Sequence, residues 1–126
     1  MRRPNYYKLV GRETVPVRNV LEWARYYDGA MNDRRRVDLT YLDTDVHVST
    51  VFMGLDHNFT GQGPPILFET MIFGSELDQS MRRYSTWDEA AAGHIALVEQ
   101  LRKVLADSPS RAVFNRILRA GISSKV

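Results

Sequence analysis

Apolar and polar residues alternate along the middle of the chain, which is the pattern of half-buried β-strands. The alternation runs through Val37–Tyr41 and, after a short turn, through Val46–Leu55. A third segment, Ile66–Phe73, is apolar on both faces apart from Glu69 and Thr70. We therefore expect these segments to form an antiparallel meander, joined by turns that are rich in Asp, Gly and Pro.

Towards the C-terminus the apolar residues recur at helical spacing instead. One stripe contains Trp87, Ala90, Ala91, His94, Leu97, Val98, Leu101, Val104 and Leu105. Ser85 and Thr86 are both candidate N-caps, because an acidic residue follows each of them three positions later. The pattern predicts a long helix over Trp87–Ala106.

Shorter elements are predicted at both ends of the chain. Val17–Asp28 has helical spacing, and Pro16 suits a first helical turn. A short helix with outward arginines is expected over Ser110–Ala120. Tyr6–Val10 is a candidate strand within an extended lead-in, and residues 32–36 are expected to form a polar connector.

Together these elements predict an α+β fold. We expect an antiparallel three- to four-stranded sheet, packed by the long helix of the C-terminal half and by the shorter N-terminal helix. Residues 1–107 would form a single α+β domain, and residues 108–126 a short basic C-terminal helix and tail. Because the central strands are apolar on both faces, each face of the sheet needs cover, which favours a homodimer or a larger homo-oligomer.

The composition is that of a globular protein, with 44% hydrophobic and 25% charged residues over 126 positions. The absence of cysteine excludes disulfides and thiolate zinc sites. No apolar run approaches the length of a membrane span, and the N-terminus lacks the apolar stretch of a signal peptide. We therefore expect a cytoplasmic protein that does not act at a membrane.

The net charge of +2 conceals a strong segregation of charge. Residues 37–81 contain seven Asp and Glu and neither Lys nor Arg, whereas the segments on both sides of them are basic. Such asymmetry either attracts an anionic partner or lets the flanks dock on the sheet or on a second subunit. We favour the docking interpretation slightly.

Asp56 and His57 form the first candidate site, since they end a strand and open a loop rich in turn-forming residues. A histidine oriented by a carboxylate can act as a base or bind a phosphate, with Asn58 beside it. The structural alternative, which we favour, is that Asp56 accepts N–H groups of the loop while His57 pins the loop in place.

His94 lies on the apolar stripe of the predicted long helix, where a lone histidine is usually a core residue with one hydrogen-bond partner. Glu69 is the one charged residue of the third strand and is therefore the suggested partner. If that pair opened onto a pocket, it would be the best acid–base candidate in the chain.

Metal, cofactor and nucleophile motifs are not found. The possible ligands His47, Asp56, His57, Glu69 and His94 share no short metal-binding spacing, so we expect no metal site. There is no phosphate-binding glycine loop and no nucleophile elbow, and Gly61-Gln62-Gly63 is followed by two prolines rather than by a helix. We expect no cofactor.

Two clusters of arginine are the remaining candidates for ligand binding: Arg34, Arg35 and Arg36, and Arg82 with Arg83. Guanidinium groups bind phosphates, and Tyr41, Tyr84 or Trp87 could stack on a base. The alternative is pairing with acidic residues of the middle segment, namely Asp43, Asp45, Glu76 and Asp78. Extended nucleic acid is an unfavoured partner, because the acidic sheet region would repel a long phosphate track.

Four segments carry a family resemblance: Val48–His57, Pro64–Met71, Arg83–Thr86 and Ala92–His94. In this order and spacing they resemble a family of small uncharacterised phage, prophage and bacterial proteins. The resemblance covers about half of the chain. It implies a compact α+β fold and a phage or mobile-element origin, and it identifies no catalytic residue.

Three classes of function remain open. The leading hypothesis is a non-enzymatic binding protein of a phage or mobile element, which inhibits host defence by sequestering a small anionic, nucleotide-like signal in the host cytoplasm. The second is an inhibitor that binds a host protein such as a defence nuclease, through the basic C-terminal helix or the acidic sheet face. The third is a small hydrolase or transferase that uses His57 or His94.

Overall fold

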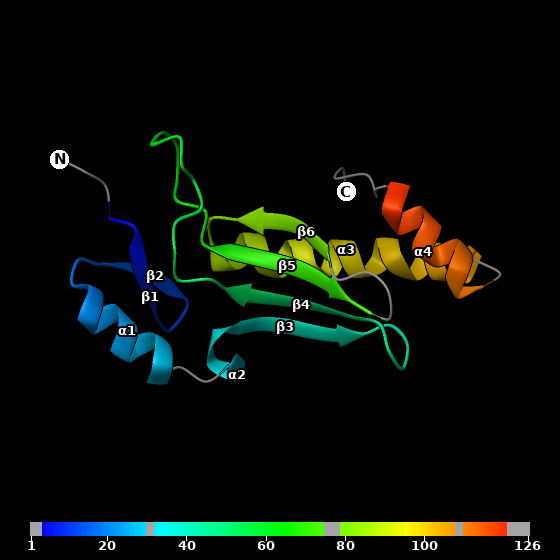
Figure 1. Ribbon diagram of the computed structural model, residues 1–126, viewed down its shortest axis with the longest axis horizontal. Helices are drawn as coiled ribbons and strands as arrows, with labels where there is room; N and C mark the ends of the chain where they lie inside the picture. The colour runs from blue at the N-terminus through cyan, green and yellow to red at the C-terminus, as the bar shows by residue number, and fades with distance from the viewer. Residues whose placement is uncertain (1–3, 30–31, 75–78, 108–109, 121–126) are drawn as a thin grey trace.

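The computed structural model describes residues 4–29, 32–74, 79–107 and 110–120, and in this part of the chain it shows an α+β fold (Figure 1). A two-stranded and a four-stranded antiparallel sheet are present. The elements in chain order are β1 Tyr6–Val10, β2 Glu13–Val17, α1 Val20–Gly29, α2 Asn32–Arg35, β3 Arg36–Tyr41, β4 His47–Phe52, β5 Phe68–Phe73, β6 Gln79–Tyr84, α3 Trp87–Asp107 and α4 Arg111–Ala120. The predicted fold class is confirmed.

The four-stranded sheet is a meander in which strands that follow each other in sequence lie side by side, in the order β3-β4-β5-β6. The three predicted strands are present as β3, β4 and β5. In the register, Val48 lies opposite Ile72 and Phe52 lies opposite Phe68. These cross-strand pairs bury large side chains next to each other, which is the main source of stability in a sheet.

One face of this sheet is covered by α3, which runs behind the strands in Figure 1. Val48, Thr50 and Phe52 of β4 point towards α3 and are fully buried, whereas the alternate residues of β4 are half-buried. On the uncovered face, the rings of Tyr41, His47 and Phe73 form a row, with neighbouring centroids 5.1 and 5.0 Å apart. Within the described residues no helix lies over this row.

The long helix α3 starts with the predicted capping box, and Thr86 is the cap. Its Oγ1 accepts the backbone N–H of Glu89 at 3.1 Å, and Glu89 Oε1 accepts the backbone N–H of Thr86 at 3.0 Å. Both bonds satisfy N–H groups that have no partner within the helix. The predicted apolar stripe is confirmed, since its buried residues are Ala90, His94, Leu97, Val98 and Leu101.

The N-terminal helix starts later than predicted. Pro16 lies in β2, opposite Tyr7 in the register, and not in a helical turn. β2 has a partner on one side only in the two-stranded sheet, and a strand of this kind tolerates proline. The helix start falls instead at Asn19, whose Oδ1 accepts the backbone N–H groups of Leu21 at 2.9 Å and Glu22 at 3.2 Å. Asn19 is therefore the N-cap of α1.

α1 packs on the β1–β2 hairpin, and the hairpin in turn is joined to the end of β4. Trp23 Nε1 donates to the carbonyl oxygen of Tyr7 at 3.1 Å. Tyr7 N donates to the carbonyl oxygen of Gly54 at 2.9 Å, and Tyr6 forms an isolated bridge with Leu55. The two sheets are thus connected through backbone hydrogen bonds.

Two buried clusters form the core. One contains Tyr7, Phe52, Leu67, Phe68 and Ala90. The other contains Val46, Val48, Ile72, Leu97, Val98, Leu101, Phe114 and Leu118. Since Phe114 and Leu118 belong to α4, the short basic helix that the sequence separates from residues 1–107 buries its apolar face in the same core as the sheet and α3.

Candidate functional site

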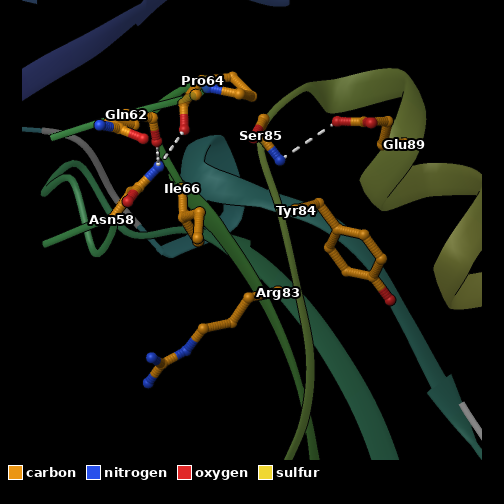
Figure 2. Close-up of a pocket in the computed structure, with 9 residues that line it drawn as sticks. Asn58, Gln62, Pro64, Ile66, Arg83, Tyr84, Ser85 and Glu89 are labelled. Atoms are coloured by element: carbon orange, nitrogen blue, oxygen red, sulfur yellow. Dashed lines mark hydrogen bonds between the residues drawn. The ribbon is translucent and has the colours of Figure 1, made fainter. Parts of the chain in front are cut away.

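A pocket of about 330 Å³ lies between the loop that follows β4 and the junction of β6 with α3 (Figure 2). Its walls are formed by Asn58, Gln62, Gly63, Pro64, Ile66, Arg83, Tyr84, Ser85 and Glu89. Three of these, Asn58, Arg83 and Tyr84, are residues that the sequence proposes for ligand binding. The fold therefore brings one part of the predicted binding set together at a single place.

Asn58 shapes the wall of this pocket, because its side chain is engaged within the loop. Its Nδ2 donates to the carbonyl oxygens of Gln62 at 2.7 Å and Pro64 at 2.8 Å. Its Oδ1 accepts both the backbone N–H of Thr60 at 3.1 Å and the Thr60 hydroxyl at 2.6 Å. Both donors and both lone pairs of the amide are thus used inside the protein.

Asp56 ties the two ends of the same loop together. Its side chain is buried, and Oδ1 accepts the backbone N–H groups of Asn58 at 2.8 Å and Ile66 at 3.0 Å. Its own backbone N–H donates to the carbonyl oxygen of Asn5 at 2.9 Å. This is the arrangement expected of a residue that fixes a loop.

Arg83 supplies the positive charge of the pocket. Its Nε donates to Glu69 Oε2 at 2.8 Å, across neighbouring strands. The Arg83 side chain is 46% exposed and that of Glu69 is 14% exposed, so the pair holds the guanidinium in place while leaving part of it accessible. Arg82 is directed elsewhere, because its Nη2 donates to Gln100 Oε1 of α3 at 2.8 Å.

The second arginine cluster lies on the far side of the sheet. Arg36 starts β3, the edge strand opposite to β6, and three strand spacings of roughly 5 Å each separate it from the β6 edge. Arg35 stacks on the ring of Tyr27, with its Cζ 4.1 Å from the ring centroid, and Arg34 is exposed on α2. The two arginine clusters therefore do not meet at one site.

Trp87 is placed for packing. Its ring lies edge-on to that of Phe68, with centroids 6.3 Å apart, and the guanidinium of Arg12 lies 5.5 Å from its centroid.

Of the suggested acidic partners for the arginines, Glu76 and Asp78 lie outside the described residues.

His57 lines a second pocket, of about 290 Å³, together with Asn5, Tyr6, Leu55, Asp56 and Phe59. Its Nδ1 donates to the carbonyl oxygen of Leu55 at 2.9 Å. Because a carbonyl only accepts, this bond places a proton on Nδ1. The neutral ring then offers Nε2 as an acceptor.

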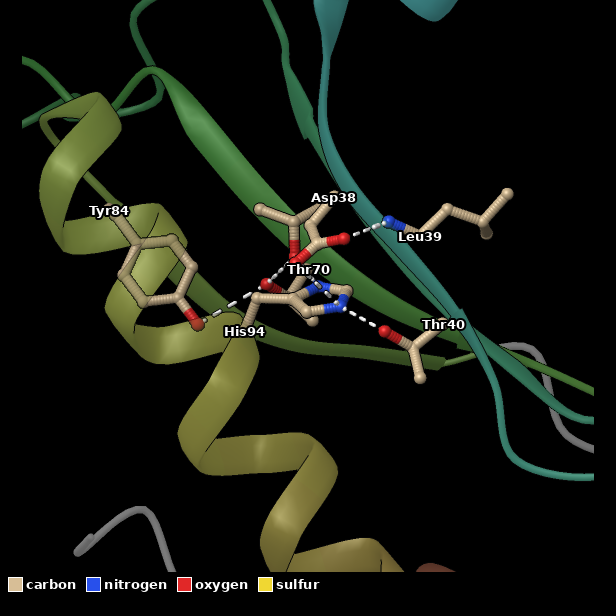
Figure 3. A network of polar contacts seen from close by, with 7 residues as sticks. Asp38, Leu39, Thr40, Thr70, Tyr84 and His94 are labelled. Carbon is tan, nitrogen blue, oxygen red and sulfur yellow. Dashed lines mark hydrogen bonds and ion pairs between the residues drawn. The ribbon is translucent and has the colours of Figure 1, made fainter.

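His94 is a buried residue with hydroxyl partners, and the suggested Glu69–His94 pair is wrong (Figure 3). The Thr40 hydroxyl lies 2.9 Å from Nε2, and the Thr50 hydroxyl lies 2.7 Å from Nδ1. Successive residues of a strand point to opposite faces, so Thr70 faces α3 while Glu69 lies on the uncovered face with Arg83. The prediction assigned Glu69 to the wrong face.

The hydroxyls around His94 form a chain that ends at Tyr84 (Figure 3). Thr50 Oγ1 lies 2.5 Å from Thr70 Oγ1, and Thr70 Oγ1 donates to the Tyr84 hydroxyl oxygen at 3.2 Å. Since Thr70 has only one hydroxyl proton, Thr50 must donate to Thr70, and His94 Nδ1–H must donate to Thr50. The chain therefore fixes the tautomer of His94, with Nε2 accepting the Thr40 proton.

Burial lowers the pKa of His94 from its ordinary value of 6.5, while the carboxylate of Asp38 acts in the opposite direction. Asp38 Oδ2 lies 3.7 Å from Nε2, on a side chain that is 47% exposed. The neutral form of His94 is thus favoured by its surroundings.

Gly93 lets α3 approach β6 closely. A Cβ atom at this position would overlap the ring of Tyr84. The ring that lines the pocket is therefore held directly against the backbone of α3, one residue before His94.

Sequence reasoning missed Gln62, Ser85 and Glu89 as pocket residues. Ser85 and Glu89 belong to a capping pattern that is visible in the sequence. That pattern predicts where α3 starts, but it does not show that these residues line a pocket. Only the return of the loop to the start of α3 places them in one pocket.

The described ranges contain no group of three His, Asp or Glu side chains arranged to hold a metal ion. No helix in the described part of the chain combines the length and the apolar character needed to cross a membrane. Comparisons of the chain with protein-family models, with curated proteins and with solved structures found no match.

Proposed function

We propose that the protein is a non-enzymatic binding protein that holds a small anionic ligand in the pocket between the β4–β5 loop and the start of α3. The observation that carries this proposal is that Asn58, Arg83 and Tyr84, which the sequence proposes for binding, line one pocket together with Ser85, although the side chains of Arg83 and Tyr84 leave β6 on opposite sides (Figure 2). The walls come from a hydrogen-bonded loop and from a capped helix, so the pocket is largely preformed.

The size and charge of the pocket favour a small ligand over a polymer. Its volume of about 330 Å³ is near the lower limit of ligand pockets, which suits a mononucleotide or another phosphorylated metabolite. Arg83 provides one accessible guanidinium, and the Ser85 hydroxyl lies in the same wall. A long phosphate track would need several cations in a row, whereas here Glu69 is paired with Arg83 and Glu89 lines the same pocket.

The biological setting we propose is the cytoplasm of a bacterial host, where the protein of a phage or mobile element would sequester a nucleotide-like signal of host defence. This part of the proposal is supported by the resemblance of residues 36–100 to small phage and prophage proteins.

The test is ligand binding by the full chain and by a variant without the cation. A panel of mononucleotides, cyclic mononucleotides and inorganic phosphate is screened by thermal shift, and each stabilising compound is titrated by calorimetry. The double variant Arg83→Gln/Glu69→Gln removes the guanidinium without leaving a half-buried carboxylate unpaired. Loss of a charge-assisted hydrogen bond is expected to weaken binding roughly 10-fold to 100-fold.

The matched control is Arg116→Gln, which removes one positive charge from the exposed side of α4. It is expected to bind as the unmodified chain does. If no compound of the panel binds, or if the double variant binds as tightly as the control, the proposal fails.

A second candidate is binding to a partner protein through the uncovered face of the sheet. The specific observation is the row of rings Tyr41, His47 and Phe73, in which Tyr41 is 63% exposed. A hydrolase is less favoured, because both ring nitrogens of the buried His94 are bound to threonine hydroxyls. Of the two histidines proposed for catalysis, His57 is the one that lines a surface pocket.

A further inference from the structure

The loop between β4 and β5 carries an aromatic ring into solvent. Phe59 is 86% exposed, which is the highest value among the large apolar side chains of the described residues. The loop itself projects beyond the end of the sheet (Figure 1). The ring of His57 lies beside it, with centroids 6.0 Å apart.

Hydrogen bonds and two glycine conformations hold the loop that carries Phe59 in a fixed shape. The Asn58 side chain bonds to the backbone of Thr60, Gln62 and Pro64, and Asp56 closes the base of the loop. Gly61 and Gly63 have φ values of +77° and +79°, a conformation that other residues adopt only with strain. The ring is therefore presented in a fixed position, and binding through it would cost little ordering entropy.

The same patch also contains a receptacle for a ring. The pocket of about 290 Å³ is lined by Asn5, Tyr6, Leu55, Asp56, His57 and Phe59 itself, and Leu55 is 38% exposed. An exposed ring at the rim of such a pocket makes the patch complementary to itself. A two-fold contact requires this property, because the same patch of both subunits meets itself.

The charge of the patch also fits a second copy of the chain. Between Asp56 and Glu69 the sequence contains no Asp, Glu, Lys or Arg, although charged residues make up 25% of the chain. In a two-fold contact every charge near the axis faces its own copy, so a neutral segment avoids repulsion. Asp56 lines the pocket, but its Oδ1 is buried and bonded to two backbone N–H groups, so an acidic or basic partner would find no exposed opposite charge on this loop.

We infer that two copies of the chain associate through this loop, with Phe59 of each copy seated in the pocket formed by Tyr6, Leu55 and His57 of the other. The contact is small compared with a standard interface of about 1,600 Å², so the dimer is weak, with a dissociation constant on the order of 10–100 µM. Phe59 is its central anchor, and most of the affinity depends on that ring. This inference is independent of any ligand in the pocket of Figure 2.

The experiment is sedimentation analysis of the full chain between roughly 10 µM and 1 mM, the range that brackets this affinity. The mean mass is expected to rise with concentration from 14.5 kDa towards twice that value. Phe59→Ser is expected to weaken dimerisation at least roughly tenfold, and Leu55→Ser, on the pocket side, to weaken it as well. Because Phe59 is exposed, its replacement leaves the fold intact, which circular dichroism verifies.

Ile95→Ser is the matched control, since Ile95 is also a large exposed apolar residue, at 56%, but lies on α3. It is expected to leave the dissociation constant unchanged. A chain that stays monomeric over the whole range overturns the inference. So does a dimer that survives Phe59→Ser but is lost in Tyr41→Ser, because the uncovered sheet face would then be the interface.

Discussion

His94 is a titratable side chain held in its neutral form inside the core. Both ring nitrogens already have partners, and adding a proton to Nε2 would place a charge in a position that is 1% exposed. Asp38, the nearest carboxylate, lies 3.7 Å from Nε2 and only partly offsets the cost of burial, so the pKa of His94 is lowered. A group whose pKa falls on folding makes the unfolded chain bind more protons than the native chain.

From this we predict a loss of stability at mildly acidic pH. His94 contributes its full stabilisation above its unfolded pKa of about 6.5, and that stabilisation decreases as the pH falls below this value towards the lower pKa of the folded state. The slope reaches at most about 1.4 kcal/mol per pH unit. Urea unfolding of the unmodified chain and of His94→Gln, at pH values between 7.5 and 5.5, measures this difference. Parallel pH profiles for the two chains would contradict the prediction.

At the level of single residues, burial was easier to predict than partners. The position of His94 on an apolar helical stripe correctly indicated a core residue, and the turn-rich context of Asp56 correctly indicated a loop tie. The partner of His94 was wrong because the choice depended on which of two neighbouring strand residues, Glu69 or Thr70, faces the helix. Which of these two residues faces α3 is set by the pairing register of β5 with β4, and a charge pattern does not reveal that register.

At the scale of elements, the start of α3 is an isolated test of helix capping. Thr86→Ala removes the hydroxyl that accepts the Glu89 N–H, so we expect a loss of about 1 kcal/mol in the free energy of unfolding. The sequence left Ser85 and Thr86 equally possible as caps. Ser85→Ala is therefore the control, and it is expected to change stability by less than about 0.5 kcal/mol. Urea denaturation of both variants checks the assignment, and a larger loss in Ser85→Ala would reverse it.

The elements with strong periodicity were predicted well, and the polar or edge elements were not. β6 has the sequence Gln-Ser-Met-Arg-Arg-Tyr, which does not alternate clearly between apolar and polar residues, and it lies at the edge of the sheet with one neighbouring strand. β2 was missed because Pro16 was interpreted as a helix start, although proline is equally at home in an edge strand. Such segments take their structure from the partner strand rather than from their own pattern.

For the whole molecule, α4 tests whether the C-terminal helix folds with the rest of the chain. Phe114 is fully buried in the cluster that contains Val48, Ile72 and Leu97. Phe114→Ala is expected to cost about 3 kcal/mol or more, because it opens a cavity in the common core. The measurement is urea unfolding followed by circular dichroism. If α4 were an independent appendage, the main transition would not move, and Arg116→Gln on the exposed side of α4 shows the effect of a surface change.

Neither pocket could be predicted at this scale. Each is built from segments that are far apart in the sequence, such as the loop beside β6 and α3, or Tyr6 beside Leu55. The segregation of charge drew attention to the arginines. It could not show that α2 and β6 place them at opposite edges of the sheet.

The backbone bonds that join the N-terminal hairpin to the end of β4 have a kinetic consequence. Asn5 and Tyr7 are bonded to Asp56 and Gly54, so each contact closes a chain segment of about fifty residues. Closing such a segment is slow compared with forming a hairpin or a helical turn, because more chain entropy is lost before the contact is gained. The base of the Phe59 loop is therefore completed late in folding. A nascent chain acquires its central sheet before it acquires the surface through which we infer that it pairs.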